Sequence, residues 1–267
     1  MKTYGSLIEV PPLFFTLPPV PYPYVLINVN HPHNGLSYIR KNRSAVRKVI
    51  IDSGIEIFRD PKVKDYPPNW IYKIVVTYKK VARLVPNALV LATCPDYCDD
   101  YNPKALWLSD KITNIERTVE NVVKYTDEFK WVNWLISVQG WNKQPTSVLR
   151  CIDLYRENGI IRKFKYFAIG NLCVELNDRL IHQTVSLVRR ELKNKILHVF
   201  GLKLKVFPKV KALIDSFDSM AWTRPVSTKK LGANWSCKNR EERVRFFKEW
   251  INRLNYYKAQ TSLEVSP

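Results

Sequence analysis

Residues 48–54 read KVIIDSG, a run of apolar residues that ends in an aspartate, a serine and a glycine. The same arrangement returns at 88–96 (ALVLATCPD), 132–140 (VNWLISVQG) and 166–171 (YFAIGN). Short runs of this kind, with no alternation of apolar and polar residues, are typical of strands buried on both faces. Strands buried on both faces are in turn typical of parallel sheets covered by helices. The repeated pattern therefore predicts a parallel sheet.

Seven such runs and the segments between them define the expected architecture. The strands are expected at 24–29, 48–52, 88–93, 132–139, 166–170, 196–201 and 213–218. Amphipathic segments between them predict helices at 69–84, 110–129, 146–157 and 178–193. No glycine-rich phosphate loop follows a strand, which favours a closed barrel over a Rossmann sheet. We therefore expect an α/β fold, a (β/α)8 TIM barrel, and about 250 residues suffice for one, so residues 1–267 would form a single domain.

The two ends of the chain are less regular. No eighth strand is evident, and the N-terminal region is expected to supply a hairpin or an irregular strand. The proline-rich part of residues 1–23, Pro11 to Pro23, predicts an extended segment that wraps the barrel or covers its bottom. Residues 240–258 predict a basic C-terminal helix with an apolar stripe. Its charged face either is solvated or grips phosphates.

The charge balance points to a polyanionic partner. The chain has 43 Lys and Arg against 24 Asp and Glu, a formal charge of +19, which favours nucleic acid; a solvated basic surface is the alternative. The cysteines are scattered and odd in number, so we expect reduced thiols rather than a disulfide framework. The sequence shows no secretory signal and no apolar run of the roughly 20 residues that a membrane span needs. We therefore expect a cytoplasmic protein, in the host cytoplasm if it is viral, with no membrane partner.

Polar residues follow the expected strands at the points where those strands end. Because catalysis in a parallel barrel takes place at the carboxyl ends of the strands, we expect Asp52, Asp96, Gln139 and Asp218 to meet on one rim. Capping of the next helix is the alternative reading of any one aspartate. Two carboxylates suit glycosidic chemistry, in which one attacks the anomeric carbon and the other handles protons. A third carboxylate and an amide can hydrogen-bond a guanine edge.

Five motifs on this rim carry a resemblance to a known family. They are IDSG at 51–54, SVQG at 137–140, AIGNL at 168–172, HVFG at 198–201 and SFDS at 216–219. In this order they resemble the motifs of tRNA-guanine transglycosylases, over most of the chain. Cys94-Pro95-Asp96 and the stretch DSMAW at 218–222 are more similar to the branch that inserts deazaguanines into DNA.

The resemblance implies a barrel enzyme, a pentosyltransferase, that replaces guanine in nucleic acid with a 7-deazaguanine of the 7-cyano type and needs no cofactor. It implies that Asp218 is the covalent nucleophile and Asp52 the general acid and base. The base would be bound by Ser53, Asp96, Gln139, Gly170, Phe200, Gly201 and Met220. The nucleic acid, DNA more than tRNA, would be held by Lys229, Lys230, Lys238, Arg240 and Arg243, with Trp222 either stacked on a base or buried in the core.

The chain departs from that family at two places. Ile55 and Glu56 stand where a glycine and an aromatic residue usually follow the aspartate motif. The usual C-terminal zinc site is missing, so no zinc subdomain and no metal are expected. Besides tRNA as the substrate, two alternatives follow: a catalytically inactive barrel that binds nucleic acid, and an unrelated hydrolase with Asp52 and Asp218 as metal ligands. His31 and His33 would lie in a turn around Pro32.

Overall fold

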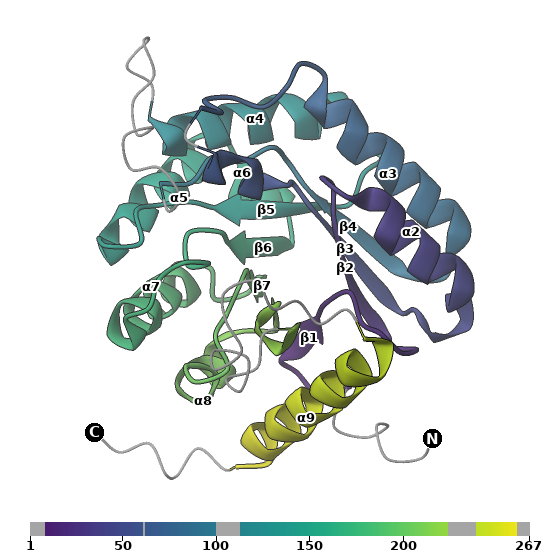
Figure 1. Ribbon diagram of the computed structural model, residues 1–267. Helices are drawn as coiled ribbons and strands as arrows, with labels where there is room; N and C mark the ends of the chain where they lie inside the picture. Colours follow the sequence, from purple (N-terminus) through teal and green to yellow (C-terminus); the bar gives the residue numbers. More distant parts are fainter. Residues whose placement is uncertain (1–8, 61, 100–112, 224–238, 261–267) are drawn as a thin grey trace.

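Eight parallel strands form a barrel in the computed structural model, which describes residues 9–60, 62–99, 113–223 and 239–260 (Figure 1). The strands are β1 (Leu13–Phe15), β2 (Tyr24–Asn28), β3 (Lys48–Asp52), β4 (Leu89–Thr93), β5 (Trp134–Val138), β6 (Tyr166–Ile169), β7 (Ile196–Val199) and β8 (Ser216–Asp218). Their order in the sheet is β1-β8-β7-β6-β5-β4-β3-β2. The predicted (β/α)8 barrel is confirmed.

The barrel closes between its first two strands. β1 pairs with β8, with Phe15 opposite Asp218. On its other side a single bridge joins Thr16 to Val25 of β2. Here the Thr16 N–H donates to the Tyr24 carbonyl at 3.3 Å, and the Thr16 carbonyl accepts from the Leu26 N–H at 2.9 Å. Thr16 therefore completes the ring that the sheet order leaves open.

All seven strands expected from the sequence are present, and the eighth is β1. The expectation that the N-terminal region supplies a further, irregular strand is confirmed by β1. The other expectation, a segment that wraps the barrel or covers its bottom, does not hold for Leu13–Phe15, because these residues form part of the barrel wall and are all buried. Three apolar residues between proline-rich neighbours are too short to show a strand pattern. Their buried positions and parallel partners, both of which depend on distant residues, make them a strand.

Helices surround the barrel (Figure 1). They are α2 (Pro32–Lys41), α3 (Trp70–Leu84), α4 (Asn114–Glu128), α5 (Val148–Glu157), α6 (Ile160–Lys163), α7 (Asp178–Glu191), α8 (Phe207–Val210) and α9 (Arg240–Ala259). The long helices expected from the sequence are present in α3, α4, α5, α7 and α9. The expected turn around Pro32 is wrong, since Pro32 opens α2 and places His33 inside a helix. Proline is tolerated at the first helical position because the amide hydrogen it lacks would have no partner there.

The basic C-terminal helix α9 serves as the helix after β8 in the outer ring. No helix stands between β1 and β2, and α9 packs beside β1 (Figure 1). The Trp250 ring lies 5.8 Å from the Phe14 ring, and the Phe247 ring lies 5.3 Å from the Tyr22 ring. The aromatic face of α9 therefore covers β1. Among the described residues, no helix is both long and apolar enough to cross a membrane.

Candidate active site

A cavity of about 450 Å³ opens at the carboxyl ends of the strands. Its wall includes residues that follow β3, β6, β7 and β8, as catalytic residues of such barrels do. Seven residues that the sequence assigned to catalysis or base binding line it: Asp52, Asp96, Gly170, Phe200, Gly201, Asp218 and Met220. Side chains as far apart in the sequence as Asp52 and Asp218 therefore face one hollow of a size suited to a small ligand.

Asp218, the last residue of β8, is held by two contacts to one carboxylate oxygen. The backbone N–H of Gly201 donates to its Oδ1 at 3.1 Å, and Nε2 of His198 lies 3.3 Å from the same oxygen. Nδ1 of His198 in turn lies 2.9 Å from the Ser216 hydroxyl. The rings of Phe15 and Phe200 pack against His198. These contacts fix the orientation of the Asp218 carboxylate at the cavity wall.

The backbone at Gly201 requires glycine. Its φ of +65° lies in the left-handed region, which glycine adopts at no steric cost. A Cβ at this position would also lie 2.8 Å from Sγ of Cys173. Glycine at this position therefore allows the backbone conformation in which the Gly201 N–H points at Asp218.

Asp52 ends β3 across the cavity mouth from β8. Nδ2 of Asn28 donates to its Oδ2 at 3.2 Å. Burial, followed by repulsion from Asp96, Asp218 and Glu56, raises the pKa of Asp52 to about 8. Each of these influences disfavours the charged form. Asp52 is therefore protonated at neutral pH and can deliver a proton.

Asp96 forms a buried cluster with two of the other predicted residues. Its Oδ1 accepts from the Ser53 hydroxyl at 2.5 Å and its Oδ2 from Nε2 of Gln139 at 2.6 Å. Burial raises the pKa of Asp96, and these hydrogen bonds oppose that effect. Ser53 and Gln139 do not line the cavity. They lie behind Asp96 and orient its carboxyl group, a role the sequence did not distinguish from direct contact.

Gln139 and Gly170 fit against each other. A Cβ at residue 170 would lie 2.2 Å from Nε2 of Gln139, closer than any real contact. Oε1 of Gln139 is buried and has no hydrogen-bond partner. Because Gln139 does not line the cavity, its amide acts through Asp96 and not by direct contact with a bound molecule.

The sequence missed several residues of the cavity wall. They lie in the segments after β2, β3, β6 and β7: Asn28, His31, Asn34, Glu56, Arg59, Cys173 and Lys203. Apart from Asn28, which ends β2 itself, none of them ends an apolar run, the pattern that marks Asp52 and Asp218. Lys203 is two residues after Gly201, and that proximity is the one hint the sequence contained.

The residues expected to hold nucleic acid have mixed outcomes. Lys229, Lys230 and Lys238 lie outside the described residues. Trp222 is 2% exposed, and its Nε1 donates to the Thr16 hydroxyl at 2.8 Å. The core position is therefore the correct alternative for Trp222, and its ring offers no face to a base. Arg240 and Arg243 lie in the first turn of α9, and the Arg243 guanidinium is 5.9 Å from the Trp222 ring centre.

Two further expectations concern Met220 and a metal site. Met220 is half exposed at the cavity wall, and its sulfur accepts from the Thr16 hydroxyl at 3.8 Å. Within the described residues, no group of three His, Cys, Asp or Glu side chains is arranged to hold a metal ion.

Comparison with known proteins finds only distant similarity in structure. No protein-family model and no curated protein matches the chain. A protein from Coccidioides immitis assigned as a fructose-1,6-biphosphate aldolase is similar in structure, with a TM-score of 0.45 and 9% identity, over 88% of this chain and 80% of that one. Rhizobium etli pyruvate carboxylase has a TM-score of 0.41 and 15% identity, over 85% of this chain and 21% of that one. The carboxyl transferase domain of that enzyme has a TM-score of 0.40 and 11% identity, over 90% of this chain and 47% of that one.

Proposed function

We propose that this protein is a base-exchange transglycosylase that replaces guanine in nucleic acid with a 7-deazaguanine. The observation that supports this most is the placement of Asp218, Asp52 and Asp96 on the wall of one cavity. An anchored carboxylate, a protonated carboxyl group and a buried carboxyl–amide cluster are the three parts such an exchange needs: a nucleophile, a proton donor and a recognition group.

In the first half-reaction Asp218 attacks C1′ of the target nucleotide. A bond forms between the Asp218 carboxylate and C1′, and the bond from C1′ to N9 of guanine breaks. The electron pair stays on N9, and Asp52 donates its proton to the departing base. The high pKa of Asp52, about 8, keeps that proton in place at neutral pH until the base leaves. The sugar is then held as an ester of Asp218.

In the second half-reaction the 7-deazaguanine occupies the same cavity. Asp52, now a carboxylate, takes the proton from N9 of the incoming base. N9 attacks C1′, and Asp218 leaves as a free carboxylate. The enzyme returns to its starting protonation state, so no cofactor is consumed.

Base recognition in this scheme falls to the cluster around Asp96. Guanine carries N–H donors at N1 and N2. Asp96, on the cavity wall, is an acceptor of the matching kind, and Gln139 orients it. Because a 7-deazaguanine keeps the N1 and N2 donors, both bases can use the same cluster.

Replacement of Asp218 with Asn tests the nucleophile. We expect exchange of labelled guanine into nucleic acid to fall by about a thousandfold or more, since the amide cannot form the sugar ester. Asp153→Asn, on the exposed face of α5, is the matched control and should retain wild-type activity. An Asp218→Asn variant that exchanges guanine at the wild-type rate would refute the mechanism.

Two further measurements separate the alternatives. Mass spectrometry of the wild-type protein incubated with nucleic acid should find a sugar adduct on Asp218, which a catalytically inactive binding barrel would lack. Nucleoside analysis of DNA and tRNA from cells with and without the protein decides the substrate. The motifs at 94–96 and 218–222 favour DNA, and a deazaguanine found only in tRNA would reverse that choice.

A further inference from the structure

The loop between β6 and α7 exposes a leucine next to the candidate active site. Leu176 is 70% exposed, the largest exposed fraction of any large hydrophobic residue that the structure describes. Val174, two residues earlier, is 38% exposed. Gly170 and Cys173 of the same loop line the cavity. An apolar side chain therefore stands in solvent beside the opening through which a substrate must enter.

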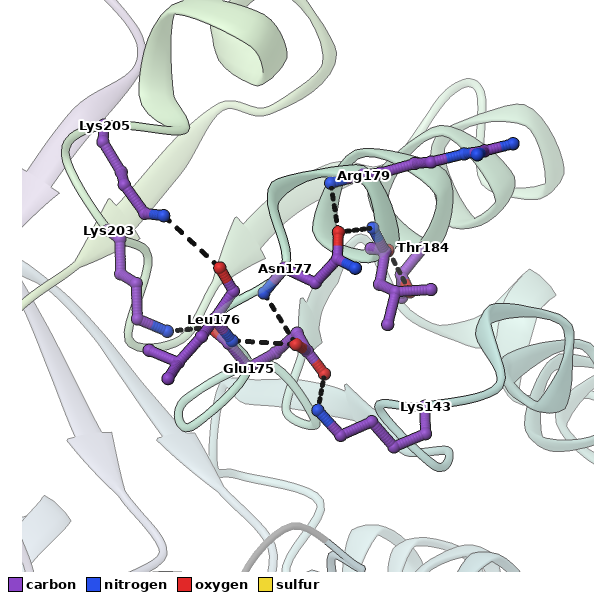
Figure 2. Close-up of polar contacts among 9 residues, drawn as sticks. Lys143, Glu175, Leu176, Asn177, Arg179, Thr184, Lys203 and Lys205 are labelled. Carbon is purple, nitrogen blue, oxygen red and sulfur yellow. Dashed lines mark hydrogen bonds and ion pairs between the residues drawn. The ribbon is translucent and has the colours of Figure 1, made fainter.

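A buried glutamate of this loop holds its backbone in place. The side chain of Glu175 is 1% exposed. Its Oε1 accepts from the backbone N–H groups of Leu176 at 2.8 Å and Asn177 at 2.7 Å. Its Oε2 pairs with Nζ of Lys143 at 2.7 Å (Figure 2). The pKa of Glu175 is lowered by these partners against the effect of burial, so it stays charged and keeps its hold on the loop.

Two lysines from the next loop hold the same peptide groups from the other side. Nζ of Lys203 donates to the Glu175 carbonyl, and Nζ of Lys205 donates to the Leu176 carbonyl at 3.3 Å. Figure 2 shows Leu176 with Lys203 and Lys205 on one side and Lys143 on the other. The peptide groups before and after Leu176 are both fixed. The backbone on both sides of Leu176 is thus fixed by hydrogen bonds while its side chain is exposed. Exposure of an apolar side chain to water is unfavourable.

The charge around Leu176 favours a polyanion. Residues 139–147, 170–178 and 200–209, which follow β5, β6 and β7, contain four lysines and two acidic residues, Asp178 and the buried Glu175. Asp178 pairs with Lys205 at 2.8 Å and lies 3.9 Å from Lys209, so the surplus on this side is positive. The Lys143 and Lys205 side chains are more than half exposed, and Lys203 lines the cavity. By contrast, residues 53–69 after β3 contain three acidic and three basic residues. A nucleic-acid backbone is therefore attracted to the β5–β7 side of the opening.

We propose that Leu176 is a wedge that enters the base stack when the target nucleotide swings into the cavity. Extruding a base breaks its stacking on both neighbours, and apolar side chains inserted between base steps fill such gaps in other systems. An ammonium group has three donors, so Lys143 and Lys205 can each add a contact to a flanking phosphate, one on either side of the wedge, while they keep the loop in place. The occupant of this surface is a stacked nucleic-acid segment, and the inference rests on the proposed base exchange.

Exchange on two matched substrates tests the wedge. One is a duplex with the target guanine paired; the other is the same duplex with an abasic site opposite that guanine, which weakens its hold in the stack. For Leu176→Ala we expect kcat/KM to fall about tenfold or more on the paired substrate and less than about threefold on the other, because the lost group acts only on the cost of extrusion. Leu176→Phe should recover most of the loss. Val76→Ala, on the exposed side of α3, is the control. Equal losses on both substrates, or no loss on either, would overturn the proposal.

A binding measurement keeps the wedge testable without the exchange chemistry. The duplex carries 2-aminopurine beside the target guanine, and its fluorescence rises when stacking on that side is lost. We expect the wild-type protein and Val76→Ala to raise it and Leu176→Ala to bind with a much smaller rise. Wild-type binding with this response but no exchange would reject the proposed function and retain the wedge. Exchange with an identical response in Leu176→Ala would reject the wedge alone, and absence of binding would reject both.

Discussion

At the scale of the residue, the surroundings of Asp52 decide its chemistry. An aspartate in water is ionised at neutral pH, but burial and three neighbouring carboxyl groups hold the pKa of Asp52 at about 8. A protonated aspartate can donate to a departing base, and the ionised form cannot. Asp218 at the end of β8 has different surroundings: it accepts from the Gly201 N–H and lies 3.3 Å from Nε2 of His198.

The rate of exchange should therefore depend on the ionisation of Asp52. We expect kcat/KM to fall as the pH rises through about 8, because the free enzyme loses the proton that the departing guanine needs. Glu56→Gln removes one of the repelling charges, so the falling limb should move to lower pH. Rates measured from about pH 6 to pH 9.5 would show this, and a profile that is identical in Glu56→Gln would contradict the assignment.

The contact between Gly170 and Gln139 gives a second test. In Gly170→Ala the new methyl group would lie 2.2 Å from Nε2 of Gln139, so the amide must leave its position against Asp96. We expect KM for the base to rise by about tenfold, as loss of one well-placed hydrogen-bond group does. Gly159→Ala, at a φ of +70° and away from the cavity wall, strains the backbone without touching the site; it controls for lost stability, which is measured alongside, and should keep the wild-type KM. Unchanged KM in Gly170→Ala would show that the cluster does not bind the base.

The aspartates of the site could be predicted from the sequence, but the residues that hydrogen-bond to them and orient them could not. Asp52, Asp96 and Asp218 end apolar runs, a signal that one chain carries by itself. The pairing of Ser53 and Gln139 with Asp96 depends on contacts across 43 positions, and no local pattern encodes such a distance. Leu176 and Glu175 were missed for the same reason, since the lysines that hold them come from neighbouring loops.

At the scale of the element, α9 follows one strand in the chain and covers another. It follows β8 in the chain, yet its Trp250 packs against Phe14 of β1, which has no helix of its own. The sequence predicted the helix and its apolar stripe, but it did not show what the stripe covers. β1 stayed hidden for a related reason: three residues carry too little pattern, and the strand exists because β8 and α9 flank it.

Truncation of that contact should cost stability. Trp250 is 7% exposed, and we expect Trp250→Ala to lower the free energy of unfolding by about 3–5 kcal/mol, the usual cost of deleting a large buried aromatic side chain. Arg253→Ala, exposed on the same helix, should change it by less than about 0.5 kcal/mol. Urea unfolding monitored by circular dichroism measures both. Similar values for the two variants would mean that α9 is not part of the folded barrel.

At the scale of the whole molecule, the site is assembled at the expense of stability. Burial, with repulsion from neighbouring carboxyl groups, raises the pKa of Asp52 to about 8, so the folded protein holds a proton there that the unfolded chain has released. Burial also raises the pKa of Asp96. Stability from this source is complete below the ordinary pKa of aspartate, about 4, and is lost as the pH rises towards 8.

The melting temperature should reflect that loss. We expect it to fall between about pH 5 and pH 8.5, and to fall less in Asp52→Asn, which has no proton to lose at this position. Differential scanning calorimetry at several pH values provides the measurement, with Asp153→Asn as the control that keeps the wild-type slope. If Asp52→Asn follows the wild-type curve throughout, Asp52 titrates normally in the folded protein.

The pairing of β1 with β8 also has a consequence for how the chain is made. Leu13 lies opposite Ser216, so a ribosome must add roughly 200 residues after the first strand before its partner exists. Until then the nascent chain carries an incomplete ring with two unpaired edges, which are templates for association with other strands. The ring can be sealed only after β8 has been made. Residues 13–15 are thus translated long before the strand that fixes their place.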